Sequence, residues 1–147
     1  MKDKFQLRGI WTISRQDRKT GKILDSETIH NLIVDTGLER IAKLINGESS
    51  TYFRAIAVGE GTDAAASGDT ELQDEVKREE ADLSYEADFK AKFAKTFTFD
   101  GSYAITEAGL FDSATVSGSV MMNRLVFAAK NVTTEIQLIV SVTITAA

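Results

Sequence analysis

The sequence predicts a mainly β protein: an antiparallel β-sandwich or flattened barrel of about seven or eight strands, with one short α-helix after the second strand. Apolar residues alternate with polar ones over 83–99 and 135–144, as in strands that have one buried face. The clearest helical spacing of apolar residues, with start and stop signals, is in segment 36–47. No linker or internal repeat divides the chain, so we expect a single domain over residues 1–147.

The first part of the chain, residues 1–31, predicts an N-terminal hairpin. Residues 4–15 read as its first strand, 17–21 as a turn that ends in a glycine, and 22–31 as its second strand. The parity of the apolar residues changes between Leu7 and Ile10, which predicts a bulge near Gly9. The hairpin is also a possible docking element, because residues 1–22 carry seven basic residues and two acidic ones.

The predicted helix has recognisable ends. Thr36 and Glu39 have the spacing of a capping box, in which each side chain bonds the other residue's amide. Asn46-Gly47 supplies the stop signal. The apolar residues spaced for one helix face are Leu38, Ile41, Ala42 and Ile45.

The middle of the chain predicts a strand, a loop and a long alternating strand. Residues 52–58 read as the strand and 59–69 as the loop, and 70–76 as a short helical piece that carries Leu72 and Val76. An unbroken strand over 83–99 would span roughly 55 Å, too long for a small domain, so we expect it to bend or break near Ala94-Lys95.

The last part of the chain predicts three more strands. A turn at 100–101 leads into the strand 103–111, and a loop over 112–119 leads into the strand 120–127. The closing strand is 135–144, where apolar and polar residues alternate.

Composition excludes several classes of function. The formal net charge is −5, and residues 60–88 carry eleven acidic residues against two basic ones, so we expect no nucleic-acid binding. The alternative to docking is that the basic and acidic segments are both solvated surface. No run of residues is apolar enough to cross a membrane, and the basic start leads into no signal-peptide core. The absence of cysteine removes disulfides and cysteine nucleophiles, and it suits assembly in a reducing cytoplasm.

The search for chemistry yields no catalytic, cofactor-binding or metal-binding residue. His30 is the only histidine, and no nucleophile-elbow motif could pair with it. Gly59-Glu60-Gly61 lacks the further residues of a phosphate loop or a dinucleotide fingerprint. Asp74 and Glu75 are neighbours in the sequence, and neighbours on a helix do not face each other. We therefore predict a protein that is not an enzyme.

Glu107 is the acidic residue with the most apolar surroundings. A partly buried carboxylate needs a donor, and Arg78 and Arg124 are the candidates for an internal salt link. Phe89, Phe93 and Phe97 share a parity with other aromatic residues, which indicates core or interface.

Several segments, taken in order, resemble the small virion structural proteins of tailed bacteriophages. They are Asn31-Leu32-Ile33-Val34-Asp35-Thr36-Gly37-Leu38, Ile41-Ala42-Lys43-Leu44-Ile45, Ile56-Ala57-Val58-Gly59-Glu60-Gly61-Thr62, Leu72 with Glu75 and Arg78, Glu107-Ala108-Gly109-Leu110-Phe111 and Met121-Met122-Asn123-Arg124, followed by the alternating C-terminal strand. The resemblance runs from about Asn31 to the C-terminus and carries over no catalytic residue.

The resemblance implies a non-enzymatic virion component, assembled in the host bacterial cytoplasm. The first hypothesis is a capsid decoration or cement protein that packs on the major capsid protein as a symmetric homo-oligomer. The second is a tail, baseplate or fibre-attachment protein whose basic hairpin docks on an acidic partner. The third is a carbohydrate-binding receptor module that stacks sugars on Trp11 and the tyrosines, although two of the three tyrosines fall where we expect core.

Overall fold

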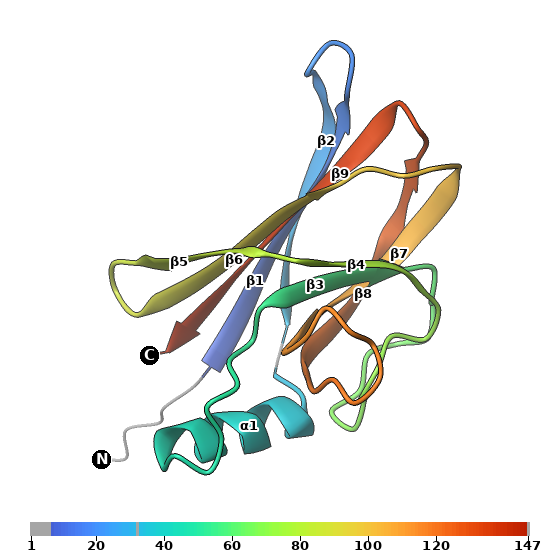
Figure 1. The fold of residues 1–147 in the computed structure, drawn as a ribbon. Helices are drawn as coiled ribbons and strands as arrows, with labels where there is room; N and C mark the ends of the chain where they lie inside the picture. Colours follow the sequence, from blue (N-terminus) through green and yellow to red (C-terminus); the bar gives the residue numbers. More distant parts are fainter. Residues whose placement is uncertain (1–6, 32, 147) are drawn as a thin grey trace.

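The computed structural model describes residues 7–31 and 33–146, which form two antiparallel sheets packed face to face, with a helix beneath them (Figure 1). The five-stranded sheet has the order β2-β1-β9-β6-β5, and the four-stranded sheet has the order β4-β3-β7-β8. The elements are β1 Leu7–Asp17, β2 Ile23–Asn31, α1 Asp35–Ile45, β3 Ala55–Gly59, β4 Glu75–Glu80, β5 Asp82–Glu86, β6 Lys90–Phe97, β7 Tyr103–Phe111, β8 Met121–Val132 and β9 Ile136–Ala146. The predicted sandwich and the helix after the second strand are confirmed.

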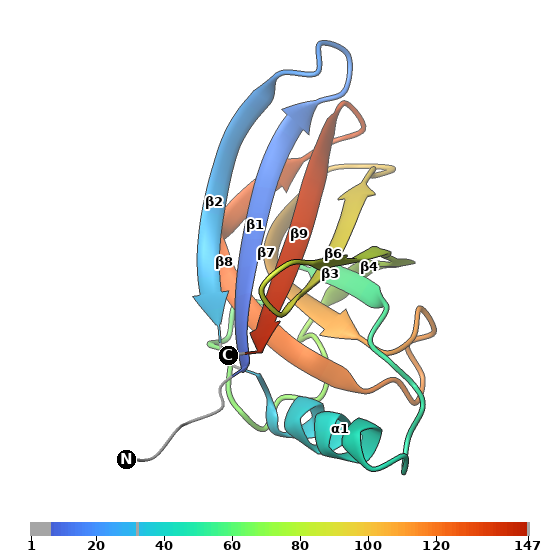
Figure 2. The same cartoon turned by 90° about the vertical axis from the view of Figure 1, so that its left-hand side faces the viewer.

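The predicted hairpin is formed by β1 and β2, and its turn extends beyond the rest of the five-stranded sheet (Figure 2). The Asp17 carboxylate accepts from the amides of Lys19 and Thr20, both at 2.9 Å, and Gly21 takes a positive φ of 74°. The part of the predicted first strand before Leu7 lies outside the described residues.

The predicted bulge near Gly9 is wrong. Pairing is regular through Gly9 on both sides of β1, and the irregularity on the β2 side falls between Arg15 and Gln16. Ile10 breaks the apolar parity because it lies on the outer face, opposite Thr143. On the inner face, a Cβ at Gly9 would lie 3.0 Å from the Asn123 side chain, so a glycine is required for space rather than for a bulge.

The helix α1 begins earlier than predicted and is capped differently. Val34 is the N-cap residue, with no side-chain cap, and the Thr36 hydroxyl donates to the Met121 carbonyl at 2.8 Å. The predicted capping box is therefore wrong, because Thr36 is already inside the helix. Its predicted end is confirmed by the C-cap Asn46 and by Gly47 at a φ of 80°.

The apolar face predicted for α1 is confirmed at Ile41 but is wrong at Leu38, Ala42 and Ile45. Leu38 and Ile45 are 49% and 80% exposed, while Gly37 is buried and Ile41 packs against the core. A Cβ at Gly37 would lie 2.8 Å from the Ile33 side chain, so the glycine lets the helix approach the chain closely at this point. That approach turns the helix so that the row through Gly37 and Ile41 faces inward.

The predicted helical piece at 70–76 is not a helix. Residues 70–74 are turn and irregular backbone, and Val76 belongs to β4, which adds a strand that the sequence analysis did not expect. The amides of Gln73 and Asp74 both donate to the Glu107 carboxylate, and the chain continues directly into β4 at Glu75.

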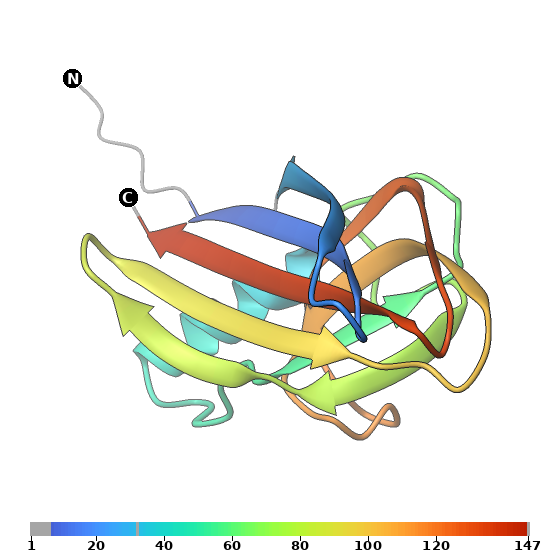
Figure 3. The same ribbon diagram turned by 90° about the horizontal axis from the view of Figure 1, so that it is seen from above.

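The alternating segment 83–99 breaks, as predicted, but it does so at 87–89, where the chain reverses direction, and not near Ala94-Lys95, which lie within β6. It forms the hairpin of β5 and β6, with its turn at 87–89 and Leu83 paired with Phe93. Figure 3 shows β4 and β5 following one another along one edge of the sandwich, so the same stretch of chain serves both sheets. The amide of Ala81, between them, donates to the Arg54 carbonyl at 2.8 Å.

The strand 103–111 is confirmed as β7, the loop 112–119 is confirmed, and β8 and β9 extend beyond the predicted 120–127 and 135–144. Two buried clusters result. The larger fills the space between the sheets and includes Trp11, Phe97 and Leu110. The smaller covers the other face of the four-stranded sheet and consists of Val34, Ala57, Leu72, Phe111 and Met121.

Candidate functional site

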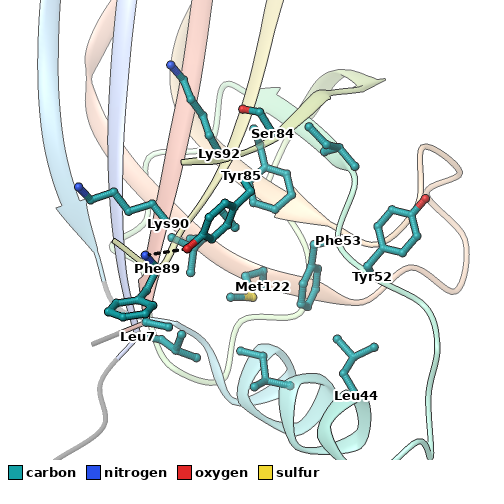
Figure 4. Close-up of a pocket in the computed structure, with 16 residues that line it drawn as sticks. Leu7, Leu44, Tyr52, Phe53, Ser84, Tyr85, Phe89, Lys90, Lys92 and Met122 are labelled. Atoms are coloured by element: carbon teal, nitrogen blue, oxygen red, sulfur yellow. Dashed lines mark hydrogen bonds between the residues drawn. The ribbon is translucent and has the colours of Figure 1, made fainter. Parts of the chain in front are cut away.

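An apolar groove of about 680 Å³ opens between the β5–β6 hairpin and α1 (Figure 4). The five-stranded sheet forms one wall and the helix forms the other, with Phe53 and Met122 between them. The sheet wall includes Leu83, Tyr85, Phe93 and Ile144, and the helix wall includes Ile41 and Leu44. The name "apolar groove" refers to these residues together with Tyr52, Phe53, Phe89 and Met122.

The groove exists because the inner face of the five-stranded sheet continues past the place where the sheets cover each other. Leu83 pairs with Phe93 across β5 and β6, and Phe93 pairs with Val142 of β9, so these side chains share one face. Phe93 is 8% exposed, whereas Leu83 is 46% and Tyr85 is 73% exposed. The apolar face is thus buried toward the middle of the molecule and open at β5.

The tip of the β5–β6 hairpin holds an aromatic ring in an unusual backbone conformation. Asp88 and Phe89 have φ values of 69° and 68°, the left-handed region that bulky residues rarely adopt. The Phe89 carbonyl accepts from the Ala146 amide at 3.0 Å, and its amide donates to the Tyr85 hydroxyl at 3.3 Å. These bonds hold the backbone that carries the Phe89 ring, which is 66% exposed at the mouth of the groove.

Polar side chains are few in the groove and lie at its rim. Figure 4 shows Lys90 and Lys92 pointing away from Phe53 and Met122. The Lys92 ammonium lies 3.4 Å from the Glu86 carboxylate. The interior of the groove is therefore suited to packing against apolar groups.

The second feature of interest is the carboxylate of Glu107 on β7, which is buried and 0% exposed. It accepts hydrogen bonds from the amides of Gly61 (2.7 Å), Gln73 (2.9 Å) and Asp74 (2.8 Å). The guanidinium of Arg124 donates to it at 2.9 Å. These contacts tie the loop between β3 and β4 to the outer face of the four-stranded sheet.

The electrostatics of Glu107 follow from these contacts. Burial alone would raise the pKa of this carboxyl, because it disfavours the charged form. The amide hydrogen bonds of Asp74 and Gln73, with the Arg124 side chain, outweigh burial and hold the pKa below its ordinary value of 4.5. The carboxylate is thus charged and fully occupied by internal partners.

The glycines beside Glu107 explain the Gly59-Glu60-Gly61 segment. A Cβ at Gly61 would lie 2.6 Å from the Glu107 carboxyl carbon, and one at Gly59 would lie 2.7 Å from its Oε2. The segment therefore closes around the protein's own carboxylate.

Of the two arginines proposed as donors to Glu107, the structure uses Arg124. Its guanidinium also lies 3.1 Å from the Asp69 carboxylate. Arg78 instead pairs with Glu75 at 2.7 Å and stacks over the Phe111 ring at 3.7 Å from its centre. The Glu75 carboxylate is therefore engaged by Arg78, whereas Asp74 contributes its backbone amide to Glu107.

The remaining candidates from the sequence lie apart from one another. His30 is exposed on β2 and paired with Ile10. Trp11 is 0% exposed and donates to the Asn31 side chain at 3.1 Å, so it is not available to stack on a sugar. Tyr85, which we expected in the core, is exposed instead.

Two searches of the described residues give negative findings. Residues 7–31 and 33–146 contain no group of three or more histidine or acidic side chains placed to hold a metal ion. Within the same residues, no helix has the length and apolar character needed to span a membrane.

No protein-family model, curated protein or solved structure matches this chain. The features of the molecule that bear on its function are therefore the apolar groove and the internal contacts of Glu107. The groove was not foreseen from the sequence, because Leu83, Tyr85 and Phe93 share the parity of ordinary core residues. Its only signal was the excess length of the 83–99 segment.

Proposed function

We propose that this protein is a non-enzymatic structural component of a tailed-bacteriophage virion, a decoration or cement protein on the head that works by packing against other virion proteins. The observation that carries this proposal is the cluster of exposed apolar side chains at the groove. Leu83, Tyr52, Phe89 and Tyr85 are 46%, 52%, 66% and 73% exposed. Contiguous exposed apolar surface of this kind marks interaction sites.

The energetics favour a protein partner for this surface. Fully burying one large apolar side chain contributes about 1.5–3 kcal/mol, so several such side chains supply much of the free energy that a stable contact needs. Trp11 lies in the core and Glu107 is held by four internal donors, so neither supports a lectin or an acid–base mechanism. The ordered resemblance of segments 31–38, 41–45, 56–62, 107–111 and 121–124 supports the virion.

The test is binding of the purified protein to expanded phage heads. The double variant Leu83→Ser with Tyr85→Ser removes exposed groove side chains, and we expect it to weaken head binding at least about tenfold, which corresponds to about 1.4 kcal/mol. The matched control is Ile23→Ser with Leu24→Ser, which changes two exposed apolar residues on β2, outside the groove. Equal binding by both double variants, or no head binding at all, would contradict the proposal.

A tail, baseplate or fibre-attachment role is the second candidate, and the projecting β1–β2 hairpin favours it. Lys19 and Lys22 are exposed near its turn, whereas Arg15 is engaged by Asp25 at 2.9 Å. Changing Lys19 and Lys22 to glutamate should weaken docking to purified tails at low salt, because exposed charges are screened at high salt. Recovery of the protein from tails alone would select this role over head decoration.

A further inference from the structure

The open edge of the five-stranded sheet lies directly beside the apolar groove. β5 is the last strand of that sheet, and among the described residues it pairs with β6 alone. All five of its residues are exposed. An edge strand of this kind presents unpaired backbone groups, which a further strand can pair with.

The side chains of β5 divide into two sets with different chemistry. Leu83 and Tyr85 point into the groove, while Asp82 and Glu86 belong to the alternate set, on the other face of the strand. Residues 79–88, which include β5, contain five acidic residues and no basic one. A strand added here would meet an apolar surface on one face and, on the other, Asp82 and Glu86, of which Glu86 also lies 3.4 Å from the Lys92 ammonium of β6.

We propose that β5 and the apolar groove bind an extended segment of a partner protein in which basic residues alternate with apolar ones, by strand addition to the five-stranded sheet. The apolar side chains of that segment would enter the groove beside Leu83 and Tyr85, and its basic side chains would lie beside Asp82 and Glu86. Backbone hydrogen bonds give affinity in this mode, and alternate side chains give specificity. The inference rests on the proposed function in one respect, that the partner is a protein.

A second copy of this chain fits the β5 edge less well. Antiparallel pairing of two β5 strands about Ser84 would place Asp82 of each copy opposite Glu86 of the other. Like charges directly opposite each other destabilise a pair of strands. The acidic edge therefore disfavours self-pairing and favours a basic strand.

An amphiphilic small molecule also fits less well. It could cover Leu83 and Tyr85, but it would leave the backbone edge of β5 unpaired. Its anionic head group would meet Lys90 and Lys92 at the rim, so the unpaired backbone edge is what argues against it. A peptide strand accounts for the groove, the edge and the charge together.

The first test measures peptide binding to the intact protein by fluorescence anisotropy. The probe is a labelled seven-residue peptide in which lysines alternate with phenylalanine, leucine and valine, and its control has glutamates in place of the lysines. We expect the lysine peptide to bind at least about tenfold more tightly at low salt. The variant Asp82→Lys with Glu86→Lys should reverse this preference. Equal binding of both peptides, or a preference that survives the charge reversal, would overturn the proposal.

The second test separates strand addition from simple packing. Two versions of the lysine peptide carry N-methyl groups on alternate residues, one set along each backbone edge. We expect one set to abolish binding and the other to leave it unchanged, because only one edge can face β5. If neither set weakens binding, strand addition is wrong.

Control variants and competing ligands complete the test. Leu83→Ser with Tyr85→Ser should abolish peptide binding, and Ile23→Ser with Leu24→Ser should leave it intact. If the protein without peptide forms a dimer, and Leu83→Ser with Tyr85→Ser abolishes that dimer, the groove binds a second copy. If the protein binds oleate tightly and does not bind the peptide, the groove binds an amphiphile. Either result overturns the proposal. Peptide binding without head binding would refute only the head assignment, and head binding without peptide binding would refute only strand addition.

Discussion

Glu107 has every internal partner that a buried carboxylate requires. Three backbone amides and Arg124 donate to it, and the amides come from the segment between β3 and β4. Removing one partner of a buried charge pair leaves the other charge without compensation. An isosteric substitution at Glu107 should therefore lower the stability of the protein strongly.

We predict that Glu107→Gln lowers the free energy of unfolding by about 3 kcal/mol at pH 7, since broken buried ion pairs cost about 3–5 kcal/mol and Asp69 still faces Arg124. The folded-state pKa of Glu107 lies below its ordinary value of 4.5, so its contribution is present above that pH and is lost as the pH falls through the folded pKa. Urea unfolding at several pH values should show the difference between the two proteins shrinking below about pH 4.5.

The control for this prediction is Glu39→Gln, which changes an exposed carboxylate that pairs with Lys43 on α1. That variant should unfold like the parent protein at neutral pH. A difference between the Glu107→Gln variant and the parent that stays constant down to strongly acidic pH would contradict the assignment of the charged state.

Two glycines give a second prediction at the same scale. A Cβ at Gly61 would press on Glu107 and Gln73, whereas a Cβ at Gly68 would meet no atom within 4 Å. We expect Gly61→Ala to cost about 1–3 kcal/mol, as overpacked sites do, and Gly68→Ala to cost nothing measurable. Thermal unfolding by circular dichroism distinguishes the two, and equal melting temperatures would refute the close fit around the carboxylate.

The sequence was sufficient to predict a salt bridge between Glu107 and either Arg78 or Arg124. A carboxylate between apolar neighbours must find a donor, and that rule needs no coordinates. It could not choose between Arg78 and Arg124, because the choice depends on which arginine the sheet register brings beside Glu107. Gly109, two residues after Glu107, pairs with Arg124, while Arg78 is engaged by Glu75.

At the scale of elements, the β5–β6 hairpin shows what alternation cannot predict. Leu83 and Phe93 face each other across the hairpin and are separated by an even number of positions, so they keep one parity. A straight strand and a hairpin of this kind therefore give the same pattern. The turn residues Ala87-Asp88-Phe89 also lack the Asn-Gly or Asp-Gly signature of a tight turn.

The hairpin turn leads to a prediction about backbone strain. A bulky residue held at positive φ costs about 1–3 kcal/mol, and glycine adopts that conformation without the cost. We expect Phe89→Gly to raise the free energy of unfolding by about 1 kcal/mol, while Phe89→Ala, which keeps the Cβ, should not. Denaturant unfolding measures both, and equal stability of the two variants would show that the left-handed backbone is not strained.

The other errors in the predicted elements have tertiary causes. The segment at 70–76 has capping signals, but its amides at Gln73 and Asp74 bond the Glu107 carboxylate and its end pairs with β3 as the start of β4. The apolar face of α1 was misplaced because Gly37, which has no side chain to bury, packs against the Met122 backbone of β8. Local pattern gave the existence of α1, β7 and β9, while contacts between distant residues decided the rest.

At the scale of the whole molecule, the two sheets share one continuous core. The larger buried cluster contains residues from β1, β3, β6, β7, β8 and β9. A core that joins both layers should not melt in parts.

We therefore predict a single cooperative unfolding transition for the chain. Far-ultraviolet circular dichroism, which reports the strands, and Trp11 fluorescence, which reports the interior, should give coincident denaturation curves. Trp11 suits this measurement because it is the only tryptophan and is 0% exposed. Two separated midpoints would show that the sheets unfold independently.

The stretch from β4 to β5 has a mechanical consequence. The chain passes from one layer to the other at Ala81 while its neighbours on both sides remain paired, to β3 before the crossing and to β6 after it. A force that slides one sheet over the other would act along both sets of backbone hydrogen bonds, those of β4 with β3 and those of β5 with β6. Many hydrogen bonds would then have to break at the same time. Such a crossing strand should give the protein a resistance to tension that neither layer would have alone.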